Sequence, residues 1–510
     1  MIKKRVYLIS GLALLFIVLT VVYFTVISPL LSNTEEQKPL ELLEGEVEGS
    51  ASSILMFAQV ERENVNSIEV HNNYGDYYFY YDEGKNDFFF KDHLDAPYSK
   101  EMISSLVTAA GFPITMKRVT EKSNDLSEYG LAESDDPAYY VLTTRDNKTH
   151  KVYIGNMIPT GAGYYTKYDG RDAVYITESS ISQTLLAPVS NLMTPILFLP
   201  LSKTDYYSVK DFILAKNGEP FIRISSETKT QKDENGNDYE DFVKYRMDYP
   251  AEYSVSTNYD TILQSFAEFY GVSVAEIAKD GEIFSKETLE KYDLANPAYE
   301  LLFTYNGIKN DILISKKNDD GTYYAYSLLF NIICVMSEEN FNFLEWDLID
   351  FVDKPILQYN INDISSITVS SKNFEETFLL YISEGNTTQN KITGATTTST
   401  DLQVKLKSTD KYIENPKNFR YFYMTILSTN LVTYADVENE NDLECLATLK
   451  LITRSGHKLE ISFYPYSTRR CLFKINGKGE FYVLKDSVEK IINDAQKVIK
   501  GEPVEYQAKN

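Results

Sequence analysis

The chain has 510 residues, of which 43% are hydrophobic and 24% are charged, so it is long enough and apolar enough for two to four folded domains. Its formal net charge of −24 makes nucleic acid and anionic lipid poor partners. Three cysteines exclude a disulfide framework. Their apolar neighbours favour free thiols, and a bond between Cys445 and Cys471 is the alternative.

The amino-terminal residues predict a membrane anchor. No charged residue occurs between Val6 and Leu31, and a helix of that length, rising about 1.5 Å per residue, can cross a hydrocarbon core of roughly 30 Å. A cleavable signal peptide would have a shorter apolar core and a small-residue cleavage site. Lys3, Lys4 and Arg5 precede the run, which predicts a cytoplasmic amino terminus. We therefore expect a cytoplasmic tail (1–5), an uncleaved transmembrane signal anchor (6–31) and an extracytoplasmic remainder in the cell membrane.

Two polar segments predict irregular structure. Residues 32–55 are rich in glutamate, and we expect them to form an acidic, solvated stalk between the membrane and the first domain. Residues 385–403 are rich in threonine and show no apolar periodicity, which predicts a mobile loop in the last domain.

Most of the remaining chain shows alternating strands joined by tight turns. Asn235-Gly236 lies between two alternating runs and is the strongest hairpin signal. Further turns are expected at 83–86, 146–147 and 169–170. Helices are expected at "SKEMISSLVTAAG", "NYDTILQSFAEFYG" and "NPKNFRYFYMTILST", and after the last hairpins at "ESSISQTLLAPVSNLM", "EENFNFLEWDLIDFV" and "KDSVEKIINDAQKVI".

A short signature occurs twice. "DLSEYGLAESDDPAYY" and "TLEKYDLANPAYE" share Leu-x-x-Tyr-x-Leu-Ala followed by Pro-Ala-Tyr. We interpret these positions as structural, with each central tyrosine packing over the turn that enters the next strand. The signature residues are Leu126, Tyr129, Leu131, Pro137 and Tyr139 in the first copy, and Leu289, Tyr292, Leu294, Pro297 and Tyr299 in the second.

The signature belongs to a longer repeat of strand, hairpin, helix, turn, hairpins and closing helix. The sequence therefore predicts an α+β protein, in which an N-terminal transmembrane helix is followed by three divergent repeat units of antiparallel β-hairpins with flanking helices, arranged as a short array. The expected units are 56–203, 204–357 and 358–510. The third is the most divergent, because it keeps Leu443 and the following hairpin but lacks the tyrosine and the proline.

Tyrosine is unusually frequent, with 40 residues that often occur as adjacent pairs. Neighbouring strand residues point to opposite faces, so each pair places one ring on each face of a sheet. Cross-strand packing explains such rings. The alternative is an aromatic contact surface for a protein or glycan partner.

The sequence predicts no enzyme of a familiar type. His71, His93, His150 and His457 lie on separate predicted elements, so a histidine zinc site is not expected. Nucleophile elbows, phosphate loops and dinucleotide fingerprints are absent from the sequence. We therefore expect no catalytic residue, cofactor or metal. A hydrolase that uses a carboxylate pair stays as a third possibility, because the 74 acidic residues offer many pairs.

The run from Pro97 to Thr194, with "DLSEYGLAESDDPAYYVLTT" and "KVYIGNMIPTGAGYYTKYDGRDAVYIT", resembles the bacterial family called domain of unknown function 4340. The second copy departs from this pattern by losing the Ile-Gly of "YIGN". The resemblance implies a membrane-anchored extracytoplasmic protein associated with an ABC export system. We therefore expect a noncatalytic accessory or scaffold protein whose partner is an ABC permease or another envelope protein. A binding module for a cell-envelope glycan is the alternative, and the ligand is unknown.

Overall fold

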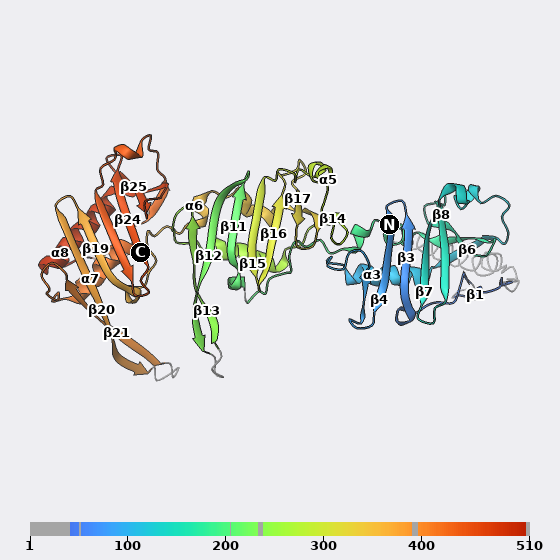
Figure 1. Cartoon of the computed structure of the whole chain (residues 1–510), viewed down its shortest axis with the longest axis horizontal. Coiled ribbons are helices and arrows are strands. Elements are labelled where there is room, and N and C mark those ends of the chain that lie inside the picture. Colours follow the sequence, from blue (N-terminus) through green and yellow to red (C-terminus); the bar gives the residue numbers. More distant parts are fainter. Residues whose placement is uncertain (1–40, 50–52, 205, 233–237, 390–395, 506–510) are drawn as a thin grey trace, which may run out of the picture. The chain divides into compact units, whose positions relative to one another are not determined.

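The structure is a computed structural model (Figure 1), and it describes residues 41–49, 53–204, 206–232, 238–389 and 396–505. The expected tail (1–5), the expected anchor (6–31) and the Asn235-Gly236 turn lie outside these residues. Within the described ranges, no helix has both the length and the apolar character needed to cross a membrane.

The described residues fold mostly as antiparallel β-sheet, in three eight-stranded sheets and one small two-stranded sheet. The first large sheet begins the series. In the order in which they lie side by side, its strands are β5 (Asp87–Phe90), β4 (Gly75–Asp82), β3 (Val65–Asn72), β7 (Ala138–Thr144), β8 (Thr149–Met157), β9 (Gly163–Tyr168), β10 (Val174–Glu178) and β6 (Thr115–Thr120). The two-stranded sheet pairs β1 (Val47–Glu48) with β2 (Ile54–Leu55).

The second large sheet has the same plan with a longer edge hairpin. Its strands, again in spatial order, are β13 (Asp238–Tyr249), β12 (Glu219–Lys232), β11 (Lys210–Lys216), β15 (Tyr299–Tyr305), β16 (Ile308–Ile314), β17 (Tyr323–Ser327), β18 (Ile332–Met336) and β14 (Ser273–Ile277). In Figure 1 the hairpin β12–β13 extends beyond the other strands of this sheet.

The third large sheet repeats the plan once more. Its strands are β21 (Thr396–Leu406), β20 (Phe374–Gln389), β19 (Ile364–Ser371), β23 (Ala447–Thr453), β24 (Lys458–Pro465), β25 (Arg470–Ile475), β26 (Phe481–Leu484) and β22 (Leu431–Tyr434). All three sheets therefore share one strand order, in which the strand that opens each expected repeat is the third from one edge.

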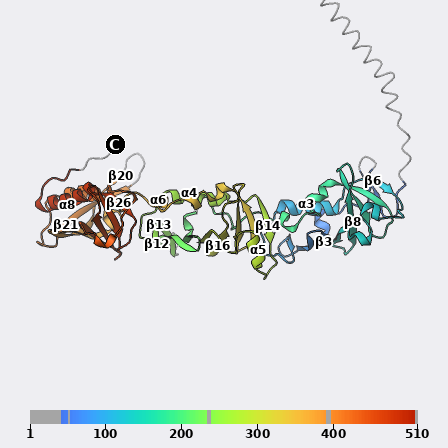
Figure 2. The ribbon, with the colours of Figure 1, turned by 90° about the horizontal axis from the view of Figure 1, so that it is seen from above.

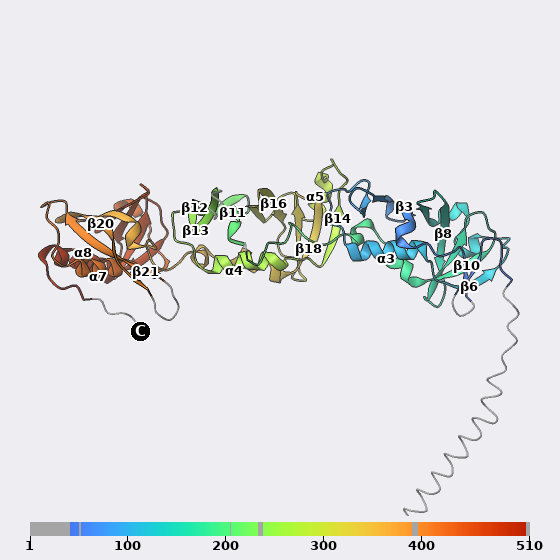
Figure 3. The same cartoon turned by 90° about the horizontal axis from the view of Figure 1, so that it is seen from below.

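One helix occupies the same place in the chain order of each repeat. It follows the edge hairpin and precedes the strand at the opposite edge of the sheet. These helices are α3 (Lys100–Gly111), α4 (Asn258–Ser265) and α7 (Pro416–Leu427). Figure 3 shows each of them along one face of its own sheet, and Figure 2 shows the same for α3 and α4. The core lies between helix and sheet, as in the second sheet, where buried Tyr259 of α4 packs edge-on against Phe212.

The expected closing helices are regular in one of three cases. The third is α8 (Lys485–Lys500), as predicted. The first is broken into the 3₁₀ turns η6 (Ser179–Gln183) and η7 (Val189–Leu192), because Pro188 cannot continue a helix. The second is split into η10 (Glu338–Glu345) and α6 (Leu348–Phe351), because Trp346 adopts extended backbone angles.

Short helical turns complete the described chain. Those of the first sheet are η3 (Arg62–Asn64), η4 (Ser127–Tyr129) and η5 (Glu133–Asp135). The later ones are η8 (Tyr206–Ser208), η9 (Phe266–Glu268), α5 (Lys286–Lys291), η11 (Ile361–Asp363) and η12 (Glu440–Asp442).

The described parts of the threonine-rich segment 385–403 are strands, so the expectation of a loop is wrong for residues 385–389 and 396–403. Strand β20 continues to Gln389, and β21 starts at Thr396, with Thr387 paired with Thr398. Threonine is β-branched and favours strands, so a run of threonines can extend a hairpin without apolar alternation.

Contacts divide the chain into two compact units. The first contains the described residues up to 91 and residues 100–188, and holds the first large sheet. The second contains residues 92–99 and 189 onward, and holds the second and third large sheets. The bounds of the three expected repeat units stay a prediction.

Candidate functional site

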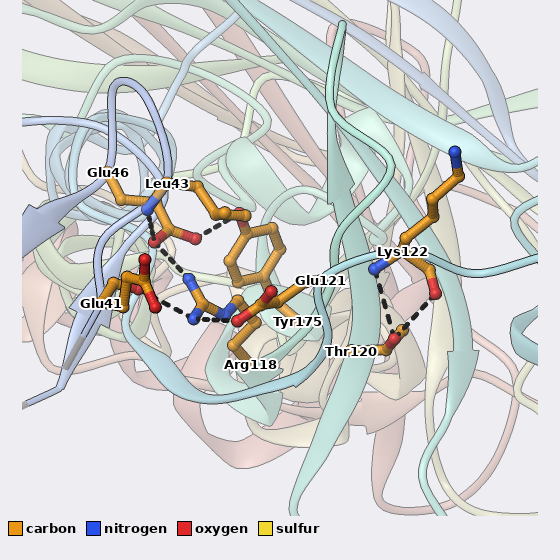
Figure 4. A network of polar contacts seen from close by, with 8 residues as sticks. All are labelled: Glu41, Leu43, Glu46, Arg118, Thr120, Glu121, Lys122 and Tyr175. Carbon is orange, nitrogen blue, oxygen red and sulfur yellow. Dashed lines mark hydrogen bonds and ion pairs between the residues drawn. The ribbon is translucent and has the colours of Figure 1, made fainter. Parts of the chain in front are cut away.

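The described part of the expected stalk is not solvated throughout, which corrects that prediction. Glu46 is buried, and its side chain has no exposed surface. One carboxylate oxygen lies 2.6 Å from an Arg118 guanidinium nitrogen, and the other accepts a hydrogen bond of 2.7 Å from Tyr175 (Figure 4). Arg118 on β6 and Tyr175 on β10 are direct cross-strand partners. The segment is therefore fastened to the edge of the first sheet.

The environment of this cluster changes the acidity of Tyr175. The pKa of Tyr175 is raised to about 12, mainly by burial and to a smaller extent by the hydrogen bond to Glu46. Tyr175 therefore stays protonated at neutral pH and donates to the carboxylate. Because the Glu46 carboxylate is paired with groups that fasten residues 41–49 to the sheet, we assign this cluster to structure.

The two signature turns are built alike. In each, the amide of the second leucine donates to the carbonyl of the first, Leu131 to Leu126 at 3.0 Å and Leu294 to Leu289 at 2.7 Å. The residue between tyrosine and leucine has positive φ in both copies, at Gly130 (68°) and Asp293 (55°). The prolines that follow, Pro137 and Pro297, are half-buried and come just before the next strand.

The central tyrosines pack in equivalent ways. The ring of Tyr129 meets Tyr165 of β9 edge-on at 4.9 Å, and that of Tyr292 meets Tyr324 of β17 edge-on at 4.8 Å. Strands β9 and β17 hold the same position in their sheets. Tyr292 is buried and donates a hydrogen bond of 2.8 Å to Glu276, whereas Tyr129 is half-buried.

The last tyrosines of the signature are not equivalent, although the sequence aligns them. Tyr139 pairs with His71 and Tyr153, whereas Tyr299 pairs with Lys216 and Ile314. The register of the second sheet is shifted by one residue here, so Glu300 occupies the position of Tyr139. A shift of one residue moves a side chain to the other face of a sheet.

Gly155, the glycine of "YIGN", has a packing role. A Cβ atom at this position would lie 2.2 Å from the carbonyl oxygen of Tyr129. The signature turn therefore crosses β8 so closely that only glycine fits. The second copy has Ser315 at the corresponding position, directly after the end of β16, which matches the loss of the Ile-Gly pair noted in its sequence.

The outward side of the first sheet carries a surface that we call the tyrosine face, made of His71, Tyr78, Tyr139, Lys151, Tyr153 and Lys167. His71, Tyr139, Tyr153 and Lys167 are successive cross-strand partners over four strands. The rings of Tyr139 and Tyr153 lie 6.0 Å apart. The Lys151 ammonium lies 3.9 Å from the centre of the first ring and 4.7 Å from that of the second.

The tyrosine face is partly exposed, with Tyr78 exposed and its other five residues half-buried, whereas the other face of the same strands is buried. Its residues alternate along β3, β7 and β8 with buried Val70, Tyr140 and Val152. Tyr78 keeps 37% of its surface exposed. The face is therefore an extended aromatic surface with ammonium groups over its rings, which matches the chemistry of a contact surface.

The four histidines have different surroundings. Burial lowers the pKa of His150 to about 4, and its ring stacks on Phe57 at 4.2 Å. His93 is buried and contacts the carbonyl oxygen of Ala278 at 2.9 Å. His71 contacts Asp76, and His457 contacts Glu252. Among the described residues, no three histidine, cysteine, aspartate or glutamate side chains gather as a metal site requires.

The three cysteines are free thiols, of which Cys445 is exposed. Burial raises the pKa of the Cys471 thiol to about 11 and that of Cys334 further. Both buried thiols therefore stay protonated at neutral pH and behave as small apolar side chains.

A polar hollow of about 740 Å³ lies between α7 and α8, the two helices that accompany the third large sheet. Its buried carboxylate, Asp494, accepts a hydrogen bond of 2.9 Å from Thr425 and pairs with Lys490. Lys497 lies 3.8 Å from the other oxygen. These contacts tie the two helices together, so we assign Asp494 to structure.

A second hollow of about 340 Å³ lies in the second sheet's layer, beside the base of the hairpin β12–β13. It is lined by aromatic rings, hydroxyl groups, an amide and one ammonium group: Tyr207, Ser208, Lys210, Ser226, Thr228, Phe242, Thr304, Asn306 and Gly307. Its residues come from four separate segments, and sequence reasoning gave no signal for it.

One family matches the chain by sequence. Residues 90–282 match the family described as "Domain of unknown function (DUF4340)". Searches of curated proteins and of solved structures return no match.

Proposed function

We propose, from the premise that residues 90–282 belong to the DUF4340 family, that this chain is a noncatalytic, membrane-anchored scaffold protein outside the cytoplasm. In this proposal, residues 6–31 form the anchor and three copies of one α+β unit follow it. The chain serves as an accessory subunit of an ABC transport system of the cell envelope, and an ABC permease is its partner.

The observation that carries the proposal is the tyrosine face. Tyrosine offers rigid, amphipathic contact area at a small cost in side-chain entropy, and aromatic residues are enriched where proteins meet. Tyr139 and Tyr153 lie next to each other on neighbouring strands, so a partner could contact both. A single predicted span cannot enclose a transport path. Energy-driven transport would therefore depend on the partner.

The association with the permease can be tested by replacing residues 6–31 with an unrelated membrane span. We expect the native chain to co-purify with an ABC permease in mild detergent, and the chain with the foreign span to recover less of it. Equal expression and equal membrane insertion of the two chains are the control. If the native chain recovers no permease, the accessory role is wrong.

Binding of a cell-envelope glycan is the second candidate. The observation in its favour is the hollow beside β12–β13, where rings and hydroxyl groups face one space. Aromatic walls with a few polar groups are typical of small-molecule sites.

A further inference from the structure

The hollow beside β12–β13 has the form of a small-ligand site. Two of its rings, Tyr207 from η8 and Phe242 from β13, lie 5.7 Å apart at an interplanar angle of 35°. Phe242 pairs across the hairpin with Thr228, which also lines the hollow. Its volume of about 340 Å³ is at the lower end of the range for ligand pockets, which run from roughly 300 to 1,000 Å³.

Two hydroxyl groups at this place lack hydrogen-bond partners among the described residues. The Ser226 hydroxyl, which belongs to the lining, is buried and unpaired there, as is the hydroxyl of Tyr245. The two residues are direct cross-strand partners, so both side chains point to the same face of the hairpin. A buried polar group without a partner costs free energy. Rotation of the Ser226 side chain toward the hollow that it lines would allow a ligand hydroxyl to satisfy this group.

The remaining lining supplies donors and acceptors around the rings. Thr228 and Thr304 contribute hydroxyl groups, Asn306 an amide, and Lys210 an ammonium group. A sugar ring matches this arrangement, because its C–H faces can pack on aromatic rings while its hydroxyl groups exchange hydrogen bonds at the edge. The net charge of −24 disfavours an acidic polymer near this surface.

We propose that the hollow lined by Tyr207, Ser226 and Phe242 binds a neutral saccharide of roughly one or two rings. This inference deepens the second candidate function, and it holds whether or not the chain binds a permease. Tyr207 and Phe242 form the aromatic wall, Ser226 lies at the buried end, and Lys210 donates a hydrogen bond to a sugar hydroxyl.

Ligand-observed saturation-transfer NMR on the full-length chain tests the proposal. The probes are cellobiose, maltose and di-N-acetylchitobiose, each at millimolar concentration, with glucuronic acid as the acidic comparison. We expect a signal from at least one neutral probe and a weaker signal from glucuronic acid. No signal from any of the three neutral probes, or a stronger signal from glucuronic acid, would overturn the proposal.

Matched variants locate the binding. Ser226→Leu fills the hollow, whereas Ser225→Leu makes the same change on the opposite face of β12, where Ser225 pairs with Arg246. We expect the neutral signal to fall at least fivefold in Ser226→Leu and to stay unchanged in Ser225→Leu. Equal signals in the two variants would show that the sugar binds elsewhere.

A second pair of variants keeps the test valid if Ser226→Leu does not fold. Tyr207 is 41% exposed, so Tyr207→Ala removes one of the two rings of the wall at little cost to folding. Tyr74→Ala removes a tyrosine that is 69% exposed in another turn. We expect loss of binding in the first variant alone. Recovery of a permease by the same variants is measured in parallel, so that failure of the sugar site and failure of the accessory role give different results.

Discussion

Replacing Glu46 with alanine is expected to lower the free energy of unfolding of the first compact unit by about 3 kcal/mol or more, because it removes the buried carboxylate that pairs with Arg118 and leaves that guanidinium with the exposed carboxylate of Glu121. The side chain of Glu46 is fully buried, and that of Arg118 is 11% exposed. Tyr175 also loses its acceptor. Urea denaturation, followed by circular dichroism, measures the change.

Arg118 offers an internal control for this experiment. Its other guanidinium nitrogen lies 2.9 Å from Glu121, whose side chain is 64% exposed. Exposed ion pairs contribute about 0–1 kcal/mol, so Glu121→Ala should have a small effect. If Glu46→Ala and Glu121→Ala destabilise the protein equally, residues 41–49 are not fastened to the sheet as described.

Tyr292→Ala is expected to lower the stability of the second compact unit by about 3 kcal/mol or more, as for other buried aromatic residues. The variant removes the edge-on contact with Tyr324 and leaves Glu276 without one of its donors. Tyr292 is 7% exposed. Thermal unfolding monitored by calorimetry measures the loss.

Tyr129→Ala is the matched comparison, because it removes the same signature residue from the first copy. Tyr129 is half-buried, so we expect a loss of roughly 1–2 kcal/mol. The two losses should appear in the transitions of different compact units. Wild-type melting of Tyr292→Ala together with lost binding of a partner would mean that the signature is a binding site.

Local sequence signals predicted the strands well. The turns expected at 83–86, 146–147 and 169–170 all lie between consecutive strands. The helix at α7 was also predicted, because Asn415 caps it and Pro416 begins it. These features depend on residues that are close together in the sequence, so the sequence alone predicts them.

Features that depend on distant residues could not be predicted in this way. Burial of Glu46 requires Arg118 and Tyr175, which are far away in the sequence. The register shift that separates Tyr139 from Tyr299 is set by pairing with β3 and β11, not by the signature itself. The hollow beside β12–β13 could not be predicted for the same reason, since its lining comes from four segments that are separate in the sequence.

The central claim is that the tyrosine face contacts an ABC permease, and site-specific photo-crosslinking in native membranes tests it most directly. A photoreactive phenylalanine derivative replaces Tyr153 on this face, and in a matched chain it replaces Tyr381, which is 46% exposed on the third sheet. We predict an adduct that contains permease peptides from position 153 and none from position 381. An absent adduct at position 153, or equal adducts at both positions, would contradict the claim.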